Sequence, residues 1–329
     1  MTKLTVTVGD YPHVQGLLAG EVPLAGYEVE EVEVKPIIGA YRRMIRDLEF
    51  DVCELAPVSY AMALQAGVPV TAIPVFLNRR FHHADIQCAA GSGIVAPKDL
   101  EGRRVGVRAY SVSTGVWGRG VLMEQYGVDN STITWIVDDD DHVEGHAPDN
   151  VERVTDGRSL GALLRAGEID AAFTGNAGTG RAGAPRAGWT AVSDSGAAAD
   201  PGDGDRESYP LFAEAEMLAR DWYLRTGIYP LHSVIALKAE LVERDPGLPT
   251  ALYRALAEAK RRQVVRDPEW SAQPHLARQA QLIGGDPVPY GVDANIESLR
   301  ALERFGREQG LLDEQPEIGL FAEGDYPPA

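Results

Sequence analysis

The sequence predicts an α/β protein of two lobes, and three observations support this fold class. The chain has 329 residues, which exceeds the usual size of a single domain. Segments rich in Val, Ile and Thr alternate with segments whose apolar residues recur at helical spacing, which indicates parallel or mixed sheets covered by helices. Finally, residues 44–52 (MIRDLEFDV) and 163–171 (LLRAGEIDA) share Arg, Glu and Asp at matching positions. Both stretches are typical of a helix that turns tightly into a strand, as expected if each lobe repeats this unit.

The first part of the chain supplies the clearest elements. Strands are expected at residues 3–8, 27–34, 50–55 and 70–76 because of their β-branched content. Tyr41, Met44, Ile45 and Leu48 follow the spacing of one helix face. A second short helix is expected over residues 59–66, ended by Gly67.

Residues 92–107, SGIVAPKDLEGRRVGV, predict a short helix followed by a buried strand. Pro97 suits the first turn of a helix, and Gly102 allows that helix to end. The strand begins at Arg104. A longer helix should follow it, with Ser111 or Ser113 as N-cap and Gly127 at its end.

The remaining elements define the predicted lobes. Residues 175–210 are rich in Gly, Ala, Asp, Ser and Pro and are expected to form long surface loops, with a mobile flap as the alternative. A strand at residues 232–237 and a long helix over residues 252–265 come next. We place the chain crossings near residues 84 and 232, so that lobe I comprises 1–84 plus 233–329 and lobe II comprises 85–232, with a ligand cleft between the lobes.

Composition narrows the class of partner. Thirty-one Lys and Arg against forty-nine Asp and Glu give a net charge of −18, which argues against nucleic acid or an anionic membrane as a partner. Cys53 and Cys88 lie in apolar runs and are expected to be buried reduced thiols rather than a bridge or a nucleophile. The first residues show no signal-peptide pattern, and no apolar run approaches about 20 residues, so we expect a cytoplasmic protein. The oligomeric state is left open.

Basic and acidic residues near the predicted crossings are the candidate catalytic groups. Arg80, His82 and His83 precede the first crossing, where Arg can pair with a carboxylate and His can move a proton near neutral pH. His232 stands at the second crossing. Glu54 ends an apolar strand, where side chains face the ligand crevice of an α/β sheet. The alternatives are a solvated basic turn, a partly buried histidine and a structural carboxylate.

The segment after residue 107 is the candidate anion site. A strand that leads into a hydroxyl-rich helix start presents free backbone N–H groups to a negative ligand. The residues expected to bind the substrate there are Tyr110, Ser113, Thr114, Trp117 and Arg119. Hydroxyl caps also occur without a ligand, and a tryptophan such as Trp117 is more often a core residue than a platform for a ligand.

Residues 138–146 resemble a metal site by composition alone. Asp138, Asp141, His142 and His146 belong to this stretch, but four successive Asp with a nearby Gly favour a solvated acidic loop. No phosphate-binding glycine loop, CxxC pair or nucleophile elbow is present, and no signal indicates pyridoxal phosphate or flavin. We therefore predict no organic cofactor and assign no metal ligand, leaving a divalent metal open.

Several segments together resemble the 4,5-dihydroxyphthalate decarboxylase family, enzymes with the type II periplasmic-binding-protein fold. The resemblance extends from about residue 3 to about residue 310. The matching pieces are FDVCEL (50–55) with Ser59 and Tyr60, AIPVF (72–76) with RFHH (80–83), residues 92–107, Thr114 with VW (116–117) and Arg119, and TGIYP (226–230) with His232. The acidic residues 138–141 depart from it, because a glycine-bearing loop is expected there.

The resemblance implies loss of carbon dioxide from a dihydroxylated benzene dicarboxylate, so a small aromatic carboxylate is the expected partner. His82 or His232 would protonate the ring carbon, and Glu54 would orient an imidazole or accept a hydroxyl proton. Arg80, Arg119 and the helix start would hold the retained carboxylate, and Ser59 and Tyr60 would line the substrate site. Two alternatives are a non-catalytic solute-binding protein for an aromatic carboxylate and another lyase on this fold, such as the dehydratase or naphthoate-forming lyase of the alternative menaquinone route.

Overall fold

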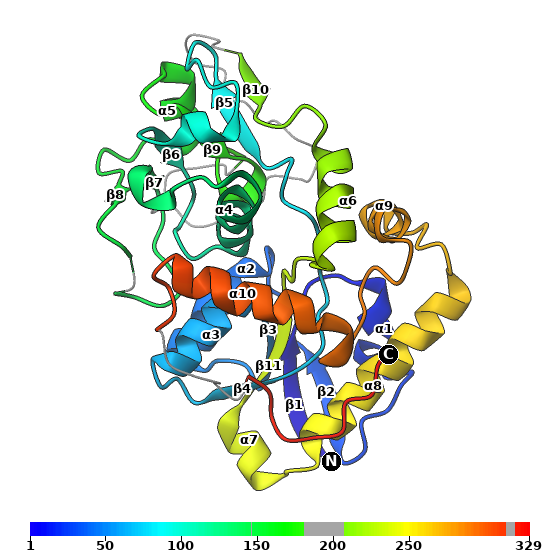
Figure 1. Cartoon of the computed structure of the whole chain (residues 1–329). Helices are drawn as coiled ribbons and strands as arrows, with labels where there is room; N and C mark the ends of the chain where they lie inside the picture. Colours follow the sequence, from blue (N-terminus) through cyan, green and yellow to red (C-terminus); the bar gives the residue numbers. More distant parts are fainter. Residues whose placement is uncertain (146, 181–206, 314–319) are drawn as a thin grey trace. The chain divides into compact units, whose positions relative to one another are not determined.

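The computed structural model describes residues 1–145, 147–180, 207–313 and 320–329 (Figure 1). Its contacts divide the chain into two compact units. Unit 1 comprises Met1–Arg80, Thr226–Ala301 and Glu314–Ala329, and unit 2 comprises Phe81–Arg225 and Leu302–Asp313. No helix in the described ranges is long and apolar enough to cross a membrane.

Unit 1 contains a five-stranded sheet of order β2-β1-β3-β11-β4. The strands are β1 (Thr2–Thr7), β2 (Tyr27–Glu31), β3 (Val52–Leu55), β4 (Val70–Ile73) and β11 (Val234–Lys238). β1 is parallel to β2 and β3, whereas β11 is antiparallel to β3 and β4. The helices are α1 (Pro12–Leu18), α2 (Ile38–Asp47), α3 (Pro57–Gln65), α7 (Ala239–Arg244), α8 (Leu248–Arg266), α9 (Pro274–Ile283), the 3-10 turn η4 (Asp293–Asn295) and the start of α10 (Ile296–Glu308).

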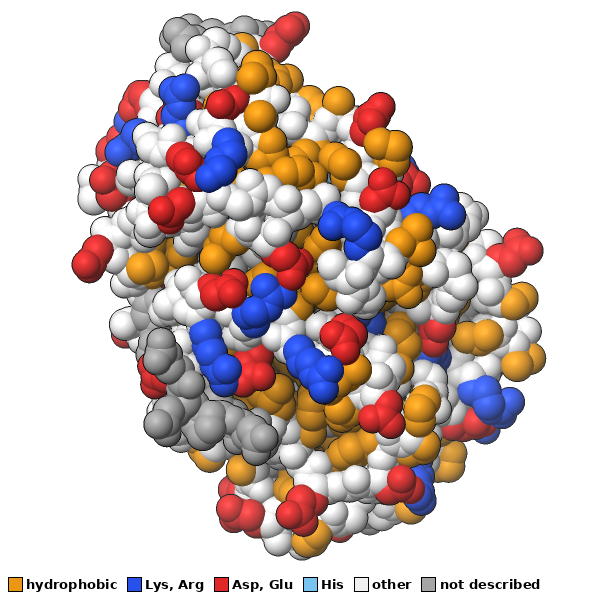
Figure 2. Space-filling view, viewed as in Figure 1, with side chains coloured by type: hydrophobic (Ala, Val, Ile, Leu, Met, Phe, Trp, Pro, Cys, Tyr) orange, Lys and Arg blue, Asp and Glu red, His pale blue; other side chains and the backbone are white. Residues whose placement is uncertain are grey.

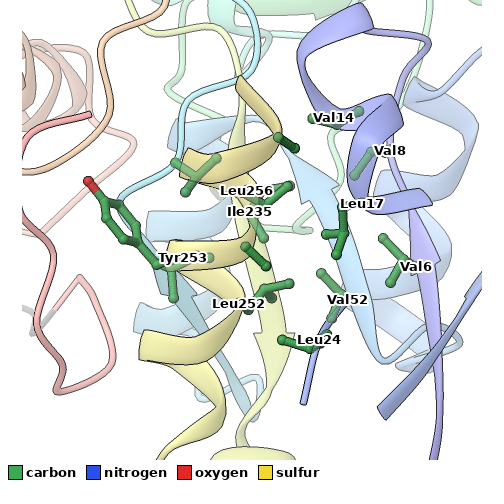
Figure 3. Packing of buried hydrophobic residues seen from close by; sticks show 14 of the residues in the cluster. Val6, Val8, Val14, Leu17, Leu24, Val52, Ile235, Leu252, Tyr253 and Leu256 are labelled. Atoms are coloured by element: carbon green, nitrogen blue, oxygen red, sulfur yellow. The ribbon is translucent and has the colours of Figure 1, made fainter. Parts of the chain in front are cut away.

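The core of unit 1 lies between its sheet and the helices α1 and α8. Val6, Val52 and Ile235 come from three strands and pack with Leu17 of α1 and Leu252 of α8 (Figure 3). Truncation of such buried side chains to Ala typically costs about 2–5 kcal/mol. This packing holds the strand ends, and the residues that follow them, in fixed positions.

Unit 2 contains a six-stranded sheet of order β10-β5-β9-β6-β7-β8. β9, β6, β7 and β8 are mutually parallel, and β5 is antiparallel to both β9 and β10. The elements are β5 (Ile86–Ala89), η1 (Pro97–Leu100), β6 (Arg104–Gly106), α4 (Ser113–Tyr126), η2 (Asn130–Thr132), β7 (Thr134–Val137), β8 (Val151–Arg153), α5 (Leu160–Ala166), β9 (Ala171–Phe173), η3 (Gly175–Ala177), β10 (Ser208–Pro210) and α6 (Ala215–Thr226).

Most predicted elements are confirmed, with shifted ends. The short helix at Pro97 and the strand after it are η1 and β6, and the predicted C-terminal helix is the longer α8. Leu48, expected inside a helix, instead ends α2 in the left-handed conformation. Of the predicted loop 175–210, residues 181–206 lie outside the described residues, but Ser208–Pro210 form a strand because they pair with β5.

The helix α4 begins differently from the prediction. Neither Ser111 nor Ser113 caps it, because Val112 occupies the N-cap position and Ser113 is the first helical residue. The Ser111 hydroxyl instead donates to Asp141 Oδ1 at 2.6 Å. Gly127 ends the helix at φ 63°, as predicted.

The contact-based units differ from the predicted lobes. The chain changes unit at residues 80/81 and 225/226, whereas the predicted crossings were near 84 and 232. Residues 302–313, placed in lobe I by prediction, belong to unit 2. The reason is packing: Phe305 contacts the ring of Trp117, and Gln309 hydrogen-bonds Arg119, both on α4.

Candidate active site

The predicted catalytic residues lie at the carboxyl edges of the two sheets. In unit 1, β1, β3 and β4 end at the edge where the antiparallel strand β11 begins, so Glu54, Arg80 and His232 belong to this edge. In unit 2, β6, β7 and β9 end where β5 begins, so His82 and residues 110–119 belong to that edge. Loops at the carboxyl ends of strands are where α/β sheets bind their ligands.

Glu54 is the centre of the unit 1 edge. Its carboxylate is buried, with the residue 1% exposed. Oε2 accepts the Gly9 N–H at 2.9 Å, and Oε1 accepts the hydroxyls of Tyr11 at 3.0 Å and Tyr41 at 2.9 Å. The Ser233 hydroxyl is a further hydrogen-bonding neighbour. We call Glu54, Gly9, Tyr11, Tyr41 and Ser233 the Glu54 cluster.

The electrostatics of this cluster suit proton transfer. Burial raises the pKa of the Glu54 carboxyl, and its hydrogen bonds from Gly9, Tyr41 and Tyr11 offset part of that rise. Burial and the neighbouring carboxylate raise the pKa of both phenols well above the usual value, so Tyr11 and Tyr41 stay protonated and donate. A buried carboxylate with a raised pKa accepts a proton more readily than an exposed one.

Sequence reasoning proposed Glu54 as a candidate but did not include its two tyrosine partners. Tyr41 was read only as part of an apolar helix face, although a buried tyrosine hydroxyl usually needs a partner. Tyr11 lies in the loop between β1 and α1, beside Gly9. The signal available was the order of elements, since β1 and β3 were both predicted strands whose carboxyl ends could meet.

The two arginines before the first crossing have different environments. Arg79 is 1% exposed and donates to the Asn295 side chain, the Tyr229 carbonyl and the Ser298 hydroxyl. It therefore ties the start of α10 to unit 1. The candidate Arg80 is half-buried.

His232 is also half-buried, and its position is set by backbone pairing. Its N–H donates to the Asn78 carbonyl at 3.0 Å, next to the isolated bridge between Arg79 and Leu231. Its neighbour Ser233 accepts the Asn78 N–H at 3.0 Å. His232 is therefore joined by backbone to the residues of the Glu54 cluster.

His82 forms a dyad with Asp85 at the unit 2 edge. His82 Nδ1 lies 2.7 Å from Asp85 Oδ2, and the histidine side chain is buried. Asp85 is positioned by its own backbone, which donates to the His82 carbonyl and accepts from Thr174. A carboxylate on Nδ1 fixes the ring orientation and assigns proton transfer to Nε2. Sequence reasoning missed Asp85, although an Asp three residues after a His in a turn was a visible signal.

His83 faces a different environment from His82. Its Nε2 lies 3.2 Å from Gln125 Oε1, and its ring packs against Phe212 and Trp222. Burial lowers the pKa of His83. His83 therefore has the contacts of a neutral, packed imidazole.

Arg119 is completely buried in unit 2. Its Nε donates to Gln309 at 2.7 Å and its Nη2 to the Tyr110 carbonyl at 2.5 Å, while the guanidinium lies over the rings of Tyr110 and Trp135. Burial lowers the pKa of Arg119, but a guanidinium keeps its charge in proteins. Arg119 links α4, residue 110 and residue 309.

The other predicted binding residues are mostly buried. Trp117 is 0% exposed and packs on Phe305, which makes it a core residue of unit 2. The Tyr110 hydroxyl accepts from Asn130, and the Tyr60 hydroxyl of unit 1 donates to the Leu320 carbonyl at 2.6 Å. Ser59, Ser113 and Thr114 are buried as well.

The acidic residues 138–141 were predicted to form a solvated loop, but of these four only Asp140 is exposed. Asp138 and Asp139 are buried, and the Asp139 carboxylate pairs with Arg108 at 3.1 Å. Asp140 pairs with Arg153. Asp141 Oδ1 accepts the Ser111 N–H at 2.7 Å. Asp139 and Asp141 therefore anchor the loop after β7 to the loop after β6.

No group of three or more His, Cys, Asp or Glu side chains in the described ranges is arranged to hold a metal ion. His146, part of the stretch that resembled a metal site, lies outside those ranges. Cys53 and Cys88 are free and buried, as predicted.

Comparison with known proteins places the chain in a family. The model described as NMT1/THI5 like matches residues 42–155. A 4,5-dihydroxyphthalate decarboxylase of Comamonas testosteroni is 30% identical over 324 residues, which cover 92% of this chain and 90% of that protein. The chain belongs to the 4,5-dihydroxyphthalate decarboxylase family. Another member, from Pseudomonas putida, is 32% identical over 180 residues, covering 52% of this chain and 69% of that protein.

Solved structures similar to this family member confirm the predicted type II periplasmic-binding-protein-like fold. The periplasmic aliphatic sulphonate binding protein SsuA from Escherichia coli is 14% identical, with a TM-score of 0.51 over 95% of both chains. The desulfurization enzyme DSZB is also 14% identical, with a TM-score of 0.50 over 97% of this chain and 95% of that one. One is a binding protein and the other an enzyme, so the fold alone does not separate the two functions.

Proposed function

We propose that the protein is a carboxy-lyase that removes one carboxylate, as carbon dioxide, from a hydroxylated benzene dicarboxylate. The observation that carries this proposal is the match to the Comamonas testosteroni 4,5-dihydroxyphthalate decarboxylase, because it extends over 92% of the chain. The substrate to test first is therefore 4,5-dihydroxyphthalate. The expected location is the cytoplasm, which fractionation of the source cells tests.

The chemistry needs a proton acceptor for a hydroxyl and a proton donor for a carbon. Ionisation of the hydroxyl para to the departing carboxylate sends electron density to the carbon that bears this carboxylate. That carbon takes a proton, and the bond to the carboxylate breaks. Its electron pair restores the aromatic ring as carbon dioxide leaves. Overall, one proton replaces one carboxylate on the ring.

His82 is the proposed proton donor to carbon, and Asp85 is its positioning residue. The 2.7 Å contact between His82 Nδ1 and Asp85 supports this role, because it holds the ring as general acid–base catalysts require. His232, at the other sheet edge, is an equal candidate, because it is half-buried whereas the His82 side chain is buried. Arg80 and the uncapped start of α4 are the proposed contacts for the substrate carboxylates. The buried Arg119 is proposed to support that helix start rather than touch the substrate.

The decisive assay measures carbon dioxide released from 4,5-dihydroxyphthalate by purified, chelator-treated protein. Ligand-induced thermal stabilisation is recorded in parallel. Release above the uncatalysed rate supports a decarboxylase that needs no added metal. Stabilisation without release, with and without divalent metal, would instead favour a solute-binding protein for an aromatic carboxylate. A product formed without carbon dioxide would indicate another lyase.

Histidine variants test the assignment of the acid. His82→Ala should lower kcat by about 10²- to 10⁴-fold, the usual contribution of a general acid. Asp85→Asn should lower kcat less and alter the pH dependence of kcat. His83→Gln is the matched control, because His83 is a neighbour that packs against aromatic rings, and we expect less than about a tenfold change. Full turnover in both His82→Ala and His232→Ala would show the assignment to be wrong.

A further inference from the structure

The Glu54 cluster raises a question that the proposed function leaves open, namely how a buried carboxylate can accept a proton from a substrate hydroxyl. Glu54, Tyr41 and Ser233 are 1%, 5% and 0% exposed, so none of them offers a contact surface. Tyr11 is the half-buried side chain of the cluster. Tyr11 is therefore the side chain through which Glu54 can exchange a proton with a bound molecule.

The hydrogen bonds of Tyr11 define the direction in which a proton can move. A phenol has one proton to donate and two lone pairs to accept with. The Tyr11 proton is directed at Glu54 Oε1, 3.0 Å away, and the Asn78 side chain hydrogen-bonds the same hydroxyl. Because Asn78 can act as the donor, one lone pair on the phenol oxygen is left to accept a further proton.

The local backbone keeps Tyr11 in this position. A Cβ added at Gly9 would lie 2.7 Å from the Tyr11 ring, closer than carbon atoms approach, so the ring occupies the space that a side chain at residue 9 would take. The His13 ring of α1 packs against the Tyr11 ring, with 5.5 Å between the two ring centroids. Gly9 also donates to Glu54 through its N–H, so the loop after β1 supplies two donors to Glu54, the Gly9 N–H and the Tyr11 hydroxyl.

We propose that Tyr11 is a catalytic residue that relays the proton of a substrate hydroxyl to Glu54. The substrate O–H proton moves to the Tyr11 oxygen as the Tyr11 proton moves to Glu54 Oε1, so no tyrosinate accumulates. The phenolate then drives protonation of the ring carbon by the proposed acid and loss of carbon dioxide. As the ring regains aromaticity, the proton returns from Glu54 through Tyr11 to the product hydroxyl. This inference rests on the proposed function and extends it to the hydroxyl end of the substrate.

The cluster contains its own matched control. Tyr11 and Tyr41 donate to the same carboxylate oxygen at nearly the same distance, 3.0 and 2.9 Å, but Tyr41 is buried. Tyr11→Phe should lower kcat by about 10²-fold or more, with little change in KM, and should remove the limb of the pH profile that reports the base. Tyr41→Phe should lower the melting temperature at least as much while lowering kcat by less than about tenfold. Equal effects of the two variants on kcat would overturn the relay, because Tyr11 would then act only as a structural donor.

A second measurement decides the inference even if 4,5-dihydroxyphthalate is not the substrate. The probe is 4-nitrocatechol, whose visible absorption changes when its hydroxyl ionises. Wild-type protein should bind it and ionise it at a pH where the free probe is protonated, and Tyr11→Phe should bind it without that change. Equal ionisation in both proteins, or no binding by the wild type in calorimetry, would overturn the relay. A wild type that ionises the probe but releases no carbon dioxide would sink the proposed function and leave Tyr11 as the hydroxyl-binding residue.

Discussion

The helix–strand turn α2–β3 in unit 1 and the turn α5–β9 in unit 2 are built in the same way, yet only the first carries a charged side chain in its strand. Both helices end at a left-handed residue, Leu48 at φ 49° and Gly167 at φ 73°. Aligned on these residues, Glu54 of β3 corresponds to Phe173 of β9. The comparison separates what the scaffold requires from what the candidate site adds.

The shared residues of the two turns have the same structural role. Asp51 accepts the Thr5 N–H of the neighbouring parallel strand at 3.0 Å, and Asp170 accepts the Arg104 N–H at 3.0 Å. The preceding acids, Glu49 and Glu168, each pair with an arginine, Arg43 and Arg158. These matches explain why Glu and Asp recur at these positions of the sequence.

The two turns differ at the position of Glu54 and Phe173, where one has a polar cluster and the other has apolar packing. Phe173 is completely buried and lies against Gly118 and the Trp135 ring. Glu54, equally buried, instead gathers donors from Gly9, Tyr11 and Tyr41. A buried carboxylate is costly unless such donors compensate it, so unit 1 maintains a polar cluster that the scaffold itself does not require.

The largest effect is expected when Glu54 is replaced by the residue at the matching position of unit 2. Glu54→Phe places the unit 2 residue in unit 1 and leaves three donors without an acceptor, so we expect a loss of about 3 kcal/mol or more in the free energy of unfolding and no turnover. Phe173→Leu in unit 2 should cost about 1–2 kcal/mol and retain turnover. Denaturant titration and the carbon dioxide assay measure both effects. A Glu54→Phe protein as stable as the wild type would contradict the view that the cluster depends on its carboxylate.

Asp51 predicts a pH dependence of the free energy of unfolding. Burial raises the pKa of Asp51, but the donors from Thr5 and Lys238 outweigh it and hold that pKa below the usual value. Because the folded pKa is depressed, this stabilisation is present above about pH 4 and is lost as pH falls through the lower folded value. Asp51→Asn should therefore cost about 1 kcal/mol at pH 7 and flatten the acid limb of stability. If the stability of Asp51→Asn decreased at acid pH in the same way as that of the wild type, Asp51 would not be the cause of this decrease.

Asp170→Asn is the matched comparison for this experiment. Asp170 accepts Arg104 N–H at 3.0 Å and has a longer contact of 3.4 Å with Arg103, whereas Asp51 has contacts of 3.0, 3.0 and 3.2 Å. We expect a smaller loss at pH 7 for Asp170→Asn, measured by urea unfolding. A larger loss of unfolding free energy than for Asp51→Asn would show that the number of donors does not determine how much each aspartate stabilises its turn.

The smallest expected effects concern the helix ends. Gly167→Ala should cost about 1 kcal/mol, because a side chain disfavours the left-handed conformation at φ 73°. Leu48→Gly relieves the same penalty but removes a half-buried side chain, so it should stay within about 0.5 kcal/mol of the wild type. Thermal unfolding of both variants checks this asymmetry. A stabilised Gly167→Ala protein would mean that the turn can adopt another conformation.

Charges of both signs are mixed on one face of the molecule. On the face that Figure 2 shows, Lys and Arg side chains are interspersed with Asp and Glu, and no continuous basic patch forms. A nucleic-acid-binding face would concentrate one sign of charge. This agrees with the net charge of −18.

The candidate site was predicted unevenly from the sequence. Glu54, His82 and the start of α4 could be proposed as candidates because strand ends and helix starts are visible as local patterns. Asp85 and Tyr11 were missed, since their importance comes from a partner rather than from a motif. The acidic residues 138–141 were misread in part for the same reason: Arg108 and Ser111 hold Asp139 and Asp141, and composition alone indicates solvent.

The sequence by itself determined the α/β class, the order of most elements and the repeated helix–strand turn, because periodicity and β-branched content act within a few residues. Only the tertiary structure decided that Tyr11 and Tyr41 contact Glu54. These tyrosines are 43 and 13 residues away from Glu54 in the chain. The register of β1 and β3, with Val6 opposite Val52, brings the loop after β1 to the end of β3. Such contacts depend on how strands align, and no local pattern encodes that alignment.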